Sequence, residues 1–403
     1  MKYIVFLGDG MADYPCEELN GKTPLELAKK PNMDYFAQHG VCGTAKTVPD
    51  GMKPGSDTAN LSVMGYAPEI YYTGRSPLEA VSVGVPLDDT DITFRANLVT
   101  LSDEENYADK TMIDYSSDEI TTPEATTLIN DLAKELNSDI LKLYPGFSYR
   151  HILVWKNGKL TFNLTPPHDI SDKKVTDYLP KGENADVLLD MMKKSHEFLK
   201  NHPVNKERIA RGLRPANSLW IWGEGKKAVL KPFSELYGVS GAVVSAVDLI
   251  KGIGLSAKME CPDIKGATGN INTNFDGKAQ TAIKLLENHD MVYIHLEAPD
   301  ECGHRHEVDN KIRSIELIDE KIIAPVIAAM KEKGEDYRVL LMPDHPTPLS
   351  LRTHVSDPVP FVLYDSTKDE KGVSVYTEKT CAETGLYIDK ASDLMGHLIR
   401  KTL

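Results

Sequence analysis

Acidic and histidine residues of this sequence gather directly after short apolar runs. Asp9 comes two residues after the run 3–7, and the runs 291–296 and 338–342 are followed by further carboxylates and imidazoles. His354 precedes a fourth apolar run. The complete set of candidates is Asp9, Asp300, His304, Asp344, His345 and His354. In open α/β sheets, sites form outside the carboxyl ends of the strands, so we expect these side chains to meet at one sheet edge.

These residue types indicate a metal site. Mixed sets of carboxylates and imidazoles suit borderline divalent ions, and six ligands are too many for one tetrahedral ion. Two ions roughly 3.5–4 Å apart can bind the attacking and leaving oxygens of a phosphoryl transfer. Any one pair of these residues, taken alone, could equally be surface charge beside a strand end. Because every cluster adjoins a predicted strand, we expect two divalent ions, with Mn²⁺ the first candidate and Zn²⁺, Mg²⁺ or Co²⁺ as alternatives.

Ser56 is the candidate nucleophile. It lies in the segment 54–62, between a glycine-containing loop and a predicted helix. A serine at a helix start faces backbone N–H groups and the positive end of the helix dipole, which suit a phosphate. An ordinary capping serine has the same sequence context, and Thr58 and Ser62 are rival hydroxyls. The Gly-x-Ser-x-Gly motif is absent around Ser56, which argues against a Ser-His-Asp hydrolase.

The elements that must position these residues form an α/β pattern. Helical segments at 281–288 and 310–333 alternate with apolar, β-branched runs, which are typical of buried parallel strands. Those four runs are 3–7, 291–296, 338–342 and 360–364. The alternation predicts an α/β fold with a doubly wound, mostly parallel sheet. Because the first strand lies near the start of the chain and the others near its end, one domain should contain both.

The middle of the chain has a different pattern, which predicts an inserted α+β domain. The expected elements are strands at 92–101, 149–155 and 160–164 and helices at 123–136 and 185–199. We therefore expect a discontinuous catalytic domain and an insert, with boundaries at 1–85, 86–205 and 206–403. A strand at 218–222 is expected to return to the first domain.

Bulk properties exclude several classes of protein. The 403 residues carry a formal net charge of -14, which disfavours nucleic acid or an anionic membrane as partner. The five cysteines are scattered and odd in number, so neither a disulfide framework nor a zinc knuckle is indicated. The run 3–7 is too short to span a membrane. We expect a cytoplasmic protein; the pattern does not fix its oligomeric state.

Five stretches, in this order, resemble the motifs of a known family. They are 8–11 (GDGM), 55–60 (GSDTAN), 300–304 (DECGH), 344–345 (DH) and 353–360 (THVSDPVP). They are similar to the metal and nucleophile motifs of the 2,3-bisphosphoglycerate-independent phosphoglycerate mutases, in the alkaline phosphatase superfamily. The chain length and the motif 74–80 (GRSPLEA) fit the shorter archaeal-type branch best.

The resemblance implies a division of the ligands between two metals. Asp9, Ser56, Asp344 and His345 would surround one ion. Asp300, His304 and His354 would hold the other, which leaves His306 outside the ligand set, although the sequence alone does not exclude it.

The resemblance also implies a phosphoglycerate substrate, whose carboxylate and phosphate require arginines and lysines. The candidates are Arg95, Arg150, His151, His168, Asp169, Arg211, Arg214 and Lys251. In the family, an Arg-Asp or His-Asp motif of the insert grips the glycerate and relays a proton, which assigns these catalytic roles to His168 and Asp169. A phosphate-binding P-loop motif and a Gly-x-Gly-x-x-Gly motif after a strand are both absent.

The implied activity is the interconversion of 3-phosphoglycerate and 2-phosphoglycerate, a step of glycolysis and gluconeogenesis, through a phosphoserine on Ser56. Water must be kept from the intermediate, so the two domains are expected to close during turnover. Three alternatives remain at this stage: a metal-dependent phosphomonoesterase, a homoserine-kinase-like phosphotransferase, and a metal-binding protein without catalysis.

Overall fold

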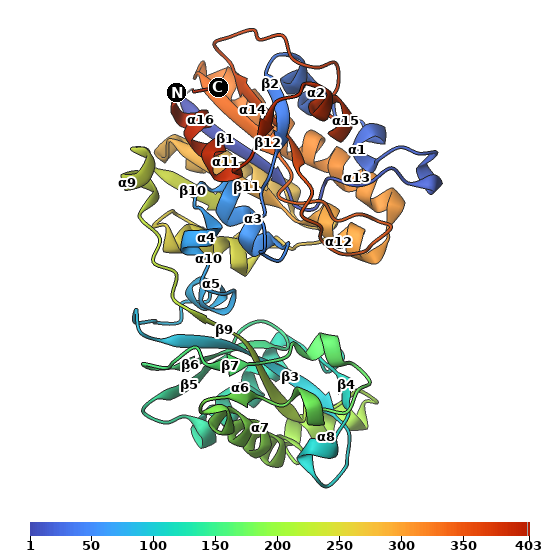
Figure 1. Ribbon diagram of the computed structural model, residues 1–403, viewed down its shortest axis with the longest axis vertical. Coiled ribbons are helices and arrows are strands. Elements are labelled where there is room, and N and C mark those ends of the chain that lie inside the picture. Colours follow the sequence, from blue (N-terminus) through green and yellow to red (C-terminus); the bar gives the residue numbers. More distant parts are fainter. Residues whose placement is uncertain (401) are drawn as a thin grey trace. The chain divides into compact units, whose positions relative to one another are not determined.

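The computed structural model describes residues 1–400 and 402–403. They form two compact units (Figure 1). Unit 1 comprises Met1–Tyr72 and Leu230–Leu403, and unit 2 comprises Thr73–Val229. Unit 2 extends beyond the insert expected at 86–205, because helix α5 (Ser76–Ser82) packs on its central strand and a further strand joins its sheet.

Unit 1 is built on a seven-stranded sheet with the order β10-β11-β1-β12-β13-β2-β14. The bounds are β1 Lys2–Gly8, β2 Val41–Ala45, β10 Gly241–Val244, β11 Met291–Leu296, β12 Tyr337–Met342, β13 Val359–Asp365 and β14 Tyr387–Ile388. Strands β11, β1 and β12 are parallel neighbours, as the sequence predicts. Strand β10, which the sequence analysis did not predict, is parallel to β11. Strand β1 therefore lies between two strands from the far end of the chain (Figure 1).

The expectation that the fourth run is another parallel strand is wrong. Strand β13 is antiparallel to β12, with Leu340 opposite Leu363, and antiparallel to β2 as well. A parallel connection needs a crossover that carries the chain back along the sheet, usually a helix. The segment 343–358 contains no helix. The chain therefore re-enters the sheet at the same end of the strands at which β12 left it.

Helices of unit 1 accompany this sheet. Their bounds are α1 Pro24–Leu27, α2 Pro31–Gln38, α3 Ser56–Val63, α4 Pro68–Tyr71, α9 Phe233–Tyr237, α10 Asp248–Ser256, α11 Phe275–Asn288, α12 Ala298–Arg305, α13 Val308–Ile318, α14 Ala324–Lys333, α15 Glu378–Glu383 and α16 Leu394–Arg400. Short 3-10 turns lie at Glu17–Leu19 and Ala391–Asp393. The helix predicted at 310–333 is α13 and α14 joined by a π-helical turn, Asp319–Ile323. Strand and helix side chains such as Ile4, Phe6, Ile294 and Ile322 form one buried core.

Unit 2 is an α+β structure with its own core. Its main sheet has the order β4-β3-β6-β5, and β9 also pairs with β3. The bounds are β3 Ile92–Leu101, β4 Met112–Asp114, β5 Leu141–Tyr144, β6 Arg150–Trp155, β7 Phe162–Asn163, β8 Lys181–Gly182, β9 Ser218–Lys226, α6 Thr122–Leu136, α7 Ala185–Leu199 and α8 Pro203–Ala210. Strands β7 and β8 form a separate pair. Short 3-10 turns lie at Tyr107–Asp109, Pro167–Ile170 and Thr176–Tyr178.

The strand predicted at 218–222 belongs to unit 2, so its expected return to the first domain is wrong. It is the first part of β9, which pairs antiparallel with β3, so that Trp220 lies opposite Asn97. Leu219, Trp220 and Ile221 are all buried in the core of unit 2. Burial of three large apolar side chains there favours pairing with β3.

Within the described residues, we find no helix that combines the length and the apolar character needed to span a bilayer.

Candidate active site

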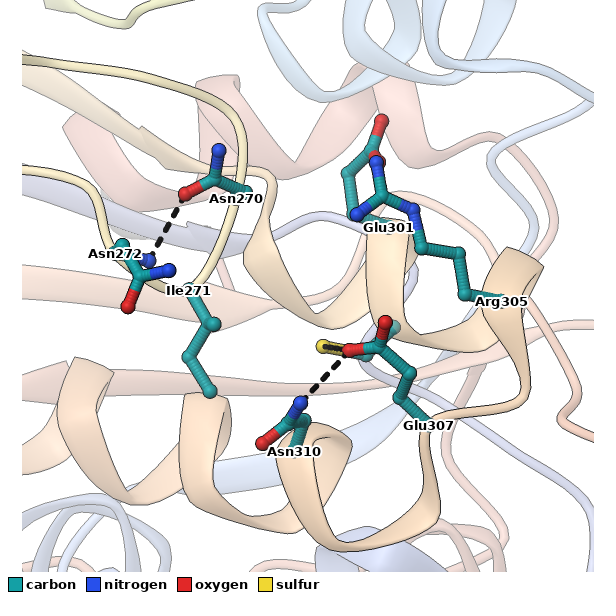
Figure 2. A pocket seen from close by; sticks show the side chains of 8 residues that line it. Asn270, Ile271, Asn272, Glu301, Arg305, Glu307 and Asn310 are labelled. Atoms are coloured by element: carbon teal, nitrogen blue, oxygen red, sulfur yellow. Dashed lines mark hydrogen bonds and ion pairs between the residues drawn. The ribbon is translucent and has the colours of Figure 1, made fainter.

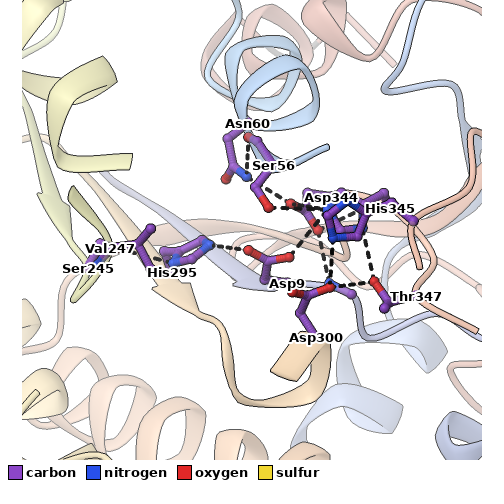
Figure 3. A network of polar contacts seen from close by, with 12 residues as sticks. Asp9, Ser56, Asn60, Ser245, Val247, His295, Asp300, Asp344, His345 and Thr347 are labelled. Carbon is purple, nitrogen blue, oxygen red and sulfur yellow. Dashed lines mark hydrogen bonds and ion pairs between the residues drawn. The ribbon is translucent and has the colours of Figure 1, made fainter. Parts of the chain in front are cut away.

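Three neighbouring parallel strands of unit 1 bring acidic and imidazole side chains to one sheet edge. Asp9 follows β1, Asp300 lies in the first turn of α12 after β11, and Asp344 and His345 follow β12. All four side chains are buried. Figure 3 shows them close together. Gly10, at φ +62°, lets the loop after β1 approach closely, since a Cβ there would lie 2.7 Å from the Cα of Asp300.

The first group of possible metal ligands is Asp300, His304 and His354, whose ligand atoms lie within 4.8 Å of one another. Nε2 of His304 is 3.3 Å from Oδ2 of Asp300, and Nε2 of His354 is 3.3 Å from Oδ1. The two Nε2 atoms are 2.9 Å apart. Nδ1 of His304 lies 2.9 Å from the carbonyl oxygen of Arg352. An Nδ1–H bond to that oxygen leaves Nε2 with a free lone pair for a cation.

The second group is Asp9, Asp300 and His345, again within 4.8 Å. Nε2 of His345 lies 3.5 Å from Oδ1 of Asp9 and 3.3 Å from Oδ2 of Asp344. Oγ of Ser56 is 3.3 Å from the same Nε2. The structure thus brings together every residue expected as a metal ligand. His306, which the resemblance leaves outside the set, contacts the carbonyl oxygen of Leu349 and the carboxylate of Glu18.

Concentrated negative charge makes this edge suitable for cations. Burial, with the carboxylates of Asp344, Asp300 and Glu297, raises the pKa of Asp9 well above its usual value. Its Oδ1 atom is buried and has no hydrogen-bond partner among the described residues. A buried carboxylate oxygen without a donor is costly unless a cation satisfies it. The residues present therefore fit a divalent metal ion.

The imidazoles respond to the same charge. Burial opposes ionisation of Asp300, but hydrogen bonds from His304 and His354 outweigh it and hold its pKa well below the usual range. The hydrogen bond to Asp300 raises the pKa of His304 to about 9. Burial lowers the pKa of His345.

Ser56 is the first residue of α3, where the initial backbone N–H groups of a helix have no partner within it. Of the three candidate hydroxyls, Ser56 contacts His345 as described above. Ser62 instead donates to the carbonyl oxygen of Thr47 at 2.5 Å, and Thr58 is buried. The geometry therefore favours Ser56 as the hydroxyl that can meet a phosphate at this edge.

Several residues that support the ligands were missed by the sequence analysis. The Nδ2 group of Asn60 donates to Oδ2 of Asp344 at 2.8 Å and to the Ser56 carbonyl oxygen at 2.9 Å. His295 lies 2.8 Å from Asp9, and Thr347 donates to Asp300 at 2.5 Å (Figure 3). His295 had a usable signal, because it is a polar side chain within an otherwise apolar run. Thr347 had none.

Unit 2 contains a cluster of guanidinium groups around one carboxylate. Nε of Arg75 lies 2.8 Å from Oε1 of Glu79, and Nε of Arg95 lies 3.0 Å from Oε2. The Arg95 guanidinium stacks over the Trp222 ring at 4.6 Å. Burial opposes ionisation of Glu79, but Arg95, Arg75 and then Arg150 outweigh it and lower its pKa. Even without Arg75, the two guanidinium groups of Arg95 and Arg150 outnumber the carboxylate of Glu79, which suits an anion.

His168 and Asp169 lie beside this cluster. The His168 ring packs edge-on against Trp222 at 5.3 Å, and its Nε2 is 3.6 Å from Oδ1 of Asp169. Burial lowers the pKa of His168; Asp169 opposes this, and Arg95 adds to it. Of the predicted substrate residues, Arg95, Arg150, His168 and Asp169 therefore belong to one neighbourhood. The sequence analysis used Arg75 and Glu79 only as part of a family motif and Trp222 only as part of a predicted strand.

Four other predicted substrate residues are engaged elsewhere. His151 is buried and its Nδ1 accepts from the Gly146 amide at 3.0 Å, while burial lowers its pKa to about 3. The remaining three pair with carboxylates: Arg211 with Glu124, Arg214 with Asp114 and Asp118, and Lys251, in unit 1, with Asp263. These partners neutralise the charge that a phosphoglycerate would need.

A separate pocket of about 230 Å³ lies beside α12 (Figure 2). Its lining is Asn270, Ile271, Asn272, Glu301, Cys302, Arg305, Glu307 and Asn310. The Arg305 guanidinium pairs with Glu301 at 2.8 Å, and Asn310 donates to Glu307 at 2.8 Å. The predicted ligands and the nucleophile are not part of this lining.

A mostly parallel α/β sheet with carboxylates, imidazoles and a helix-start serine at the carboxyl ends of its strands is the arrangement that a metal-dependent phosphotransferase requires. Comparisons with known proteins narrow this class. A sequence profile described as 2,3-bisphosphoglycerate-independent phosphoglycerate mutase matches residues 37–205. A protein of that name from Methanosarcina barkeri is 48% identical over 402 residues, covering 99% of this chain and 100% of the relative. The chain belongs to the 2,3-bisphosphoglycerate-independent phosphoglycerate mutase family, which confirms the resemblance of the motifs.

Two solved structures have the same fold. A protein from Pyrococcus horikoshii aligns with a TM-score of 0.83 at 29% identity, covering 99% of this chain and 96% of the other. A cofactor-independent phosphoglycerate mutase from Thermoplasma acidophilum aligns with a TM-score of 0.68 at 24% identity, covering 100% of both chains. The predicted fold class is therefore confirmed.

Proposed function

We propose that this protein interconverts 3-phosphoglycerate and 2-phosphoglycerate through a phosphoserine on Ser56. The observation that carries the proposal is the placement of the Ser56 hydroxyl 3.3 Å from Nε2 of His345, within the set of buried carboxylates and imidazoles. Membership of the family supports it.

Two divalent cations complete the site, with Mn²⁺ as the first candidate and Zn²⁺, Mg²⁺ or Co²⁺ as alternatives. Asp9, Asp344 and His345 would hold one beside Ser56, and Asp300, His304 and His354 would hold the other. Bound cations lower the pKa of the serine hydroxyl and neutralise the phosphate oxygens.

In the first half-reaction, the ionised Oγ of Ser56 attacks phosphorus in line, and the bond from phosphorus to O3 of the glycerate breaks. The electron pair of that bond leaves with O3, which takes a proton from the pair of His168 and Asp169. In the second half-reaction, that pair removes the proton of the 2-hydroxyl, and O2 attacks the phosphoserine. The phosphorus–Oγ bond then breaks and restores Ser56, so the cycle gains or loses neither a proton nor a phosphate.

The arginine cluster of unit 2 would bind the anionic substrate. Arg95 and Arg150, with Arg75, supply guanidinium groups suited to a carboxylate. Negative charge on the bound substrate would raise the pKa of His168, because it favours the imidazolium. Arg211, Arg214, Lys251 and His151 have weaker support, since each is engaged by a local partner.

A coupled assay tests this function. The protein is incubated with 3-phosphoglycerate and Mn²⁺, enolase converts any 2-phosphoglycerate formed, and phosphate is measured in parallel. We expect enolase-dependent turnover with little free phosphate, and its loss on chelation. Steady phosphate release without 2-phosphoglycerate would identify a phosphomonoesterase, and activity only with ATP and homoserine would identify a kinase.

We also propose a cytoplasmic location. All five cysteines are free thiols, as expected in a reducing compartment.

A further inference from the structure

Strand β11 carries two polar side chains in a fully buried position. Tyr293 and His295 have no exposed surface, and being two residues apart they lie on the same face of the strand. A buried polar group is costly unless it is hydrogen-bonded. His295 meets this requirement at the candidate ligand Asp9, and Tyr293 meets it at Asn60, which supports the candidate ligand Asp344.

His295 joins a hydrogen-bonded chain that ends on Asp9 (Figure 3). Its Nε2 lies 2.8 Å from Oδ2 of Asp9, and its Nδ1 lies 3.2 Å from Oγ of Ser245. Oγ of Ser245 also accepts from the amide of Val247 at 3.0 Å. The Ser245 hydroxyl can therefore donate to Nδ1, which leaves the proton of the neutral imidazole on Nε2, directed at Asp9.

This arrangement distinguishes the two oxygens of Asp9. Oδ2 is occupied by His295, whereas Oδ1 is buried without a hydrogen bond, 3.5 Å from Nε2 of His345. Without the imidazole, rotation of the carboxylate could exchange the two oxygens. The structure gives each of them a different task.

We propose that His295 is a positioning residue, which fixes the Asp9 carboxylate so that Oδ1 faces the cation beside Ser56. Ser245 supports it by fixing the tautomer. The inference rests on the proposed function, because it requires Asp9 to be a metal ligand. Groups that orient a metal ligand in this way typically change metal affinity by ~10–100-fold when removed.

Tyr293 offers a matched comparison on the same face of β11. Its hydroxyl donates to Oδ1 of Asn60 at 2.7 Å, and Asn60 in turn donates to Asp344. Asp344, however, also accepts from the amides of Gly10 at 3.0 Å and His345 at 2.8 Å. Tyr293→Phe should therefore weaken metal binding by less than about threefold, although it too alters a buried group.

The test measures Mn²⁺ affinity and stoichiometry by electron paramagnetic resonance for the wild type, His295→Phe, His295→Gln and Tyr293→Phe, with Asp9→Asn as reference. We expect His295→Phe to lower the affinity for one of the two Mn²⁺ ions by ~10–100-fold. Turnover of this variant should return at high Mn²⁺ concentration. The Nε2 amide of His295→Gln can still donate to Asp9, so this variant should restore most of the affinity. If His295 had a purely structural role, His295→Phe and His295→Gln would both have a lower unfolding temperature, but their Mn²⁺ affinities would not differ.

Each result decides one question. The inference would be overturned if folded His295→Phe bound Mn²⁺ with wild-type affinity, or if His295→Gln bound Mn²⁺ no more tightly than His295→Phe. Neither result would contradict the proposed mutase function. Wild-type protein that binds no divalent ion would overturn the proposed function and the inference together. If His295→Phe does not fold, Ser245→Ala is the deciding variant. A loss of Mn²⁺ affinity of about threefold or more supports the positioning role of His295, and unchanged Mn²⁺ affinity refutes it.

Discussion

The two charged clusters of this protein are opposite in sign and in construction. In unit 1, carboxylates and imidazoles follow the ends of parallel strands, and Asp9 retains a buried oxygen without a donor. In unit 2, the carboxylate of Glu79 lies among Arg95 of β3, Arg150 at the start of β6 and Arg75 just before α5. The first cluster lacks positive charge and the second has an excess of it. Cations therefore suit the first, and an anionic substrate suits the second.

The comparison suggests that unit 1 makes and breaks the bonds to phosphorus, whereas unit 2 binds the substrate. If it holds, changes in unit 1 should act mainly on kcat, and changes in unit 2 mainly on KM or kcat/KM.

The largest effect is expected from Ser56→Ala. Removing the nucleophile should lower kcat by on the order of 10³-fold or more, while the carboxylates and imidazoles still bind metal. Turnover from the enolase-coupled assay and metal content from atomic absorption would be measured on the same sample. Turnover close to wild type would remove Ser56 from the mechanism and transfer the role to another hydroxyl.

A smaller effect is expected from Arg150→Ala in unit 2. This exposed guanidinium packs over Tyr149 at 5.1 Å and has no carboxylate partner among the ion pairs of the described residues. Its removal should lower kcat/KM by about tenfold with little loss of stability, since it would remove one charged contact to the substrate.

Arg214→Ala is the matched control, because that guanidinium is neutralised by Asp114 at 3.1 Å and Asp118 at 3.3 Å. Steady-state kinetics should give values within about twofold of wild type for this variant. Equal losses in both variants would mean that the cluster of unit 2 does not define the anion site.

The remaining effects concern stability and its pH dependence rather than turnover, and they sharpen the contrast between the units. Burial raises the pKa of Glu378 in unit 1 to about 7, whereas arginines lower that of Glu79 in unit 2. A carboxyl whose pKa is raised on folding loses stability as the pH rises from its unfolded value through 7. Glu378→Gln should therefore stabilise the protein at pH 8 by on the order of 2 kcal/mol, and less at pH 5.

Glu79→Gln should have the opposite sign. A lowered pKa contributes stability above the unfolded value of the carboxyl, so the substitution should destabilise the protein at pH 8. Urea unfolding of both variants at pH 5 and pH 8 checks the two signs. Destabilisation by Glu378→Gln that is equal at both pH values would show that its hydrogen bonds to Asp13 and Thr23 matter more than its burial.

The cluster of candidate metal ligands in unit 1 was easier to predict than the arginine cluster of unit 2 for a geometric reason. Carboxyl ends of parallel strands converge, so a residue such as Asp9 or Asp344 can be placed once its strand is recognised. Arg95 lies inside β3 and Arg150 begins β6, which is antiparallel to β3. Nothing in the sequence spacing of these two arginines tells which face of the sheet they occupy or that Arg75 joins them. The sequence gives no reason to separate Arg211 and Arg214 from Arg95 and Arg150. Their charges are nevertheless neutralised by carboxylates that lie far away in the sequence.

Topology followed the same rule. The parallel strands β1, β11 and β12 were predictable from apolar runs separated by helical segments. The antiparallel direction of β13 depends on the path of a loop without regular structure. The pairing of β9 with β3 depends on burial of Trp220 in the core of unit 2, which is formed by residues far apart in the sequence. Neither leaves a local signal in the sequence.

The most direct test of the mechanism is to trap the phosphoenzyme. Wild-type protein with Mn²⁺ is mixed with 3-phosphoglycerate labelled in its phosphate, quenched in acid within one turnover, digested and analysed by mass spectrometry. The account predicts labelled phosphate on the peptide that contains Ser56, and its absence in Ser56→Ala. Turnover without labelled peptide, or a label on a different residue, would contradict it.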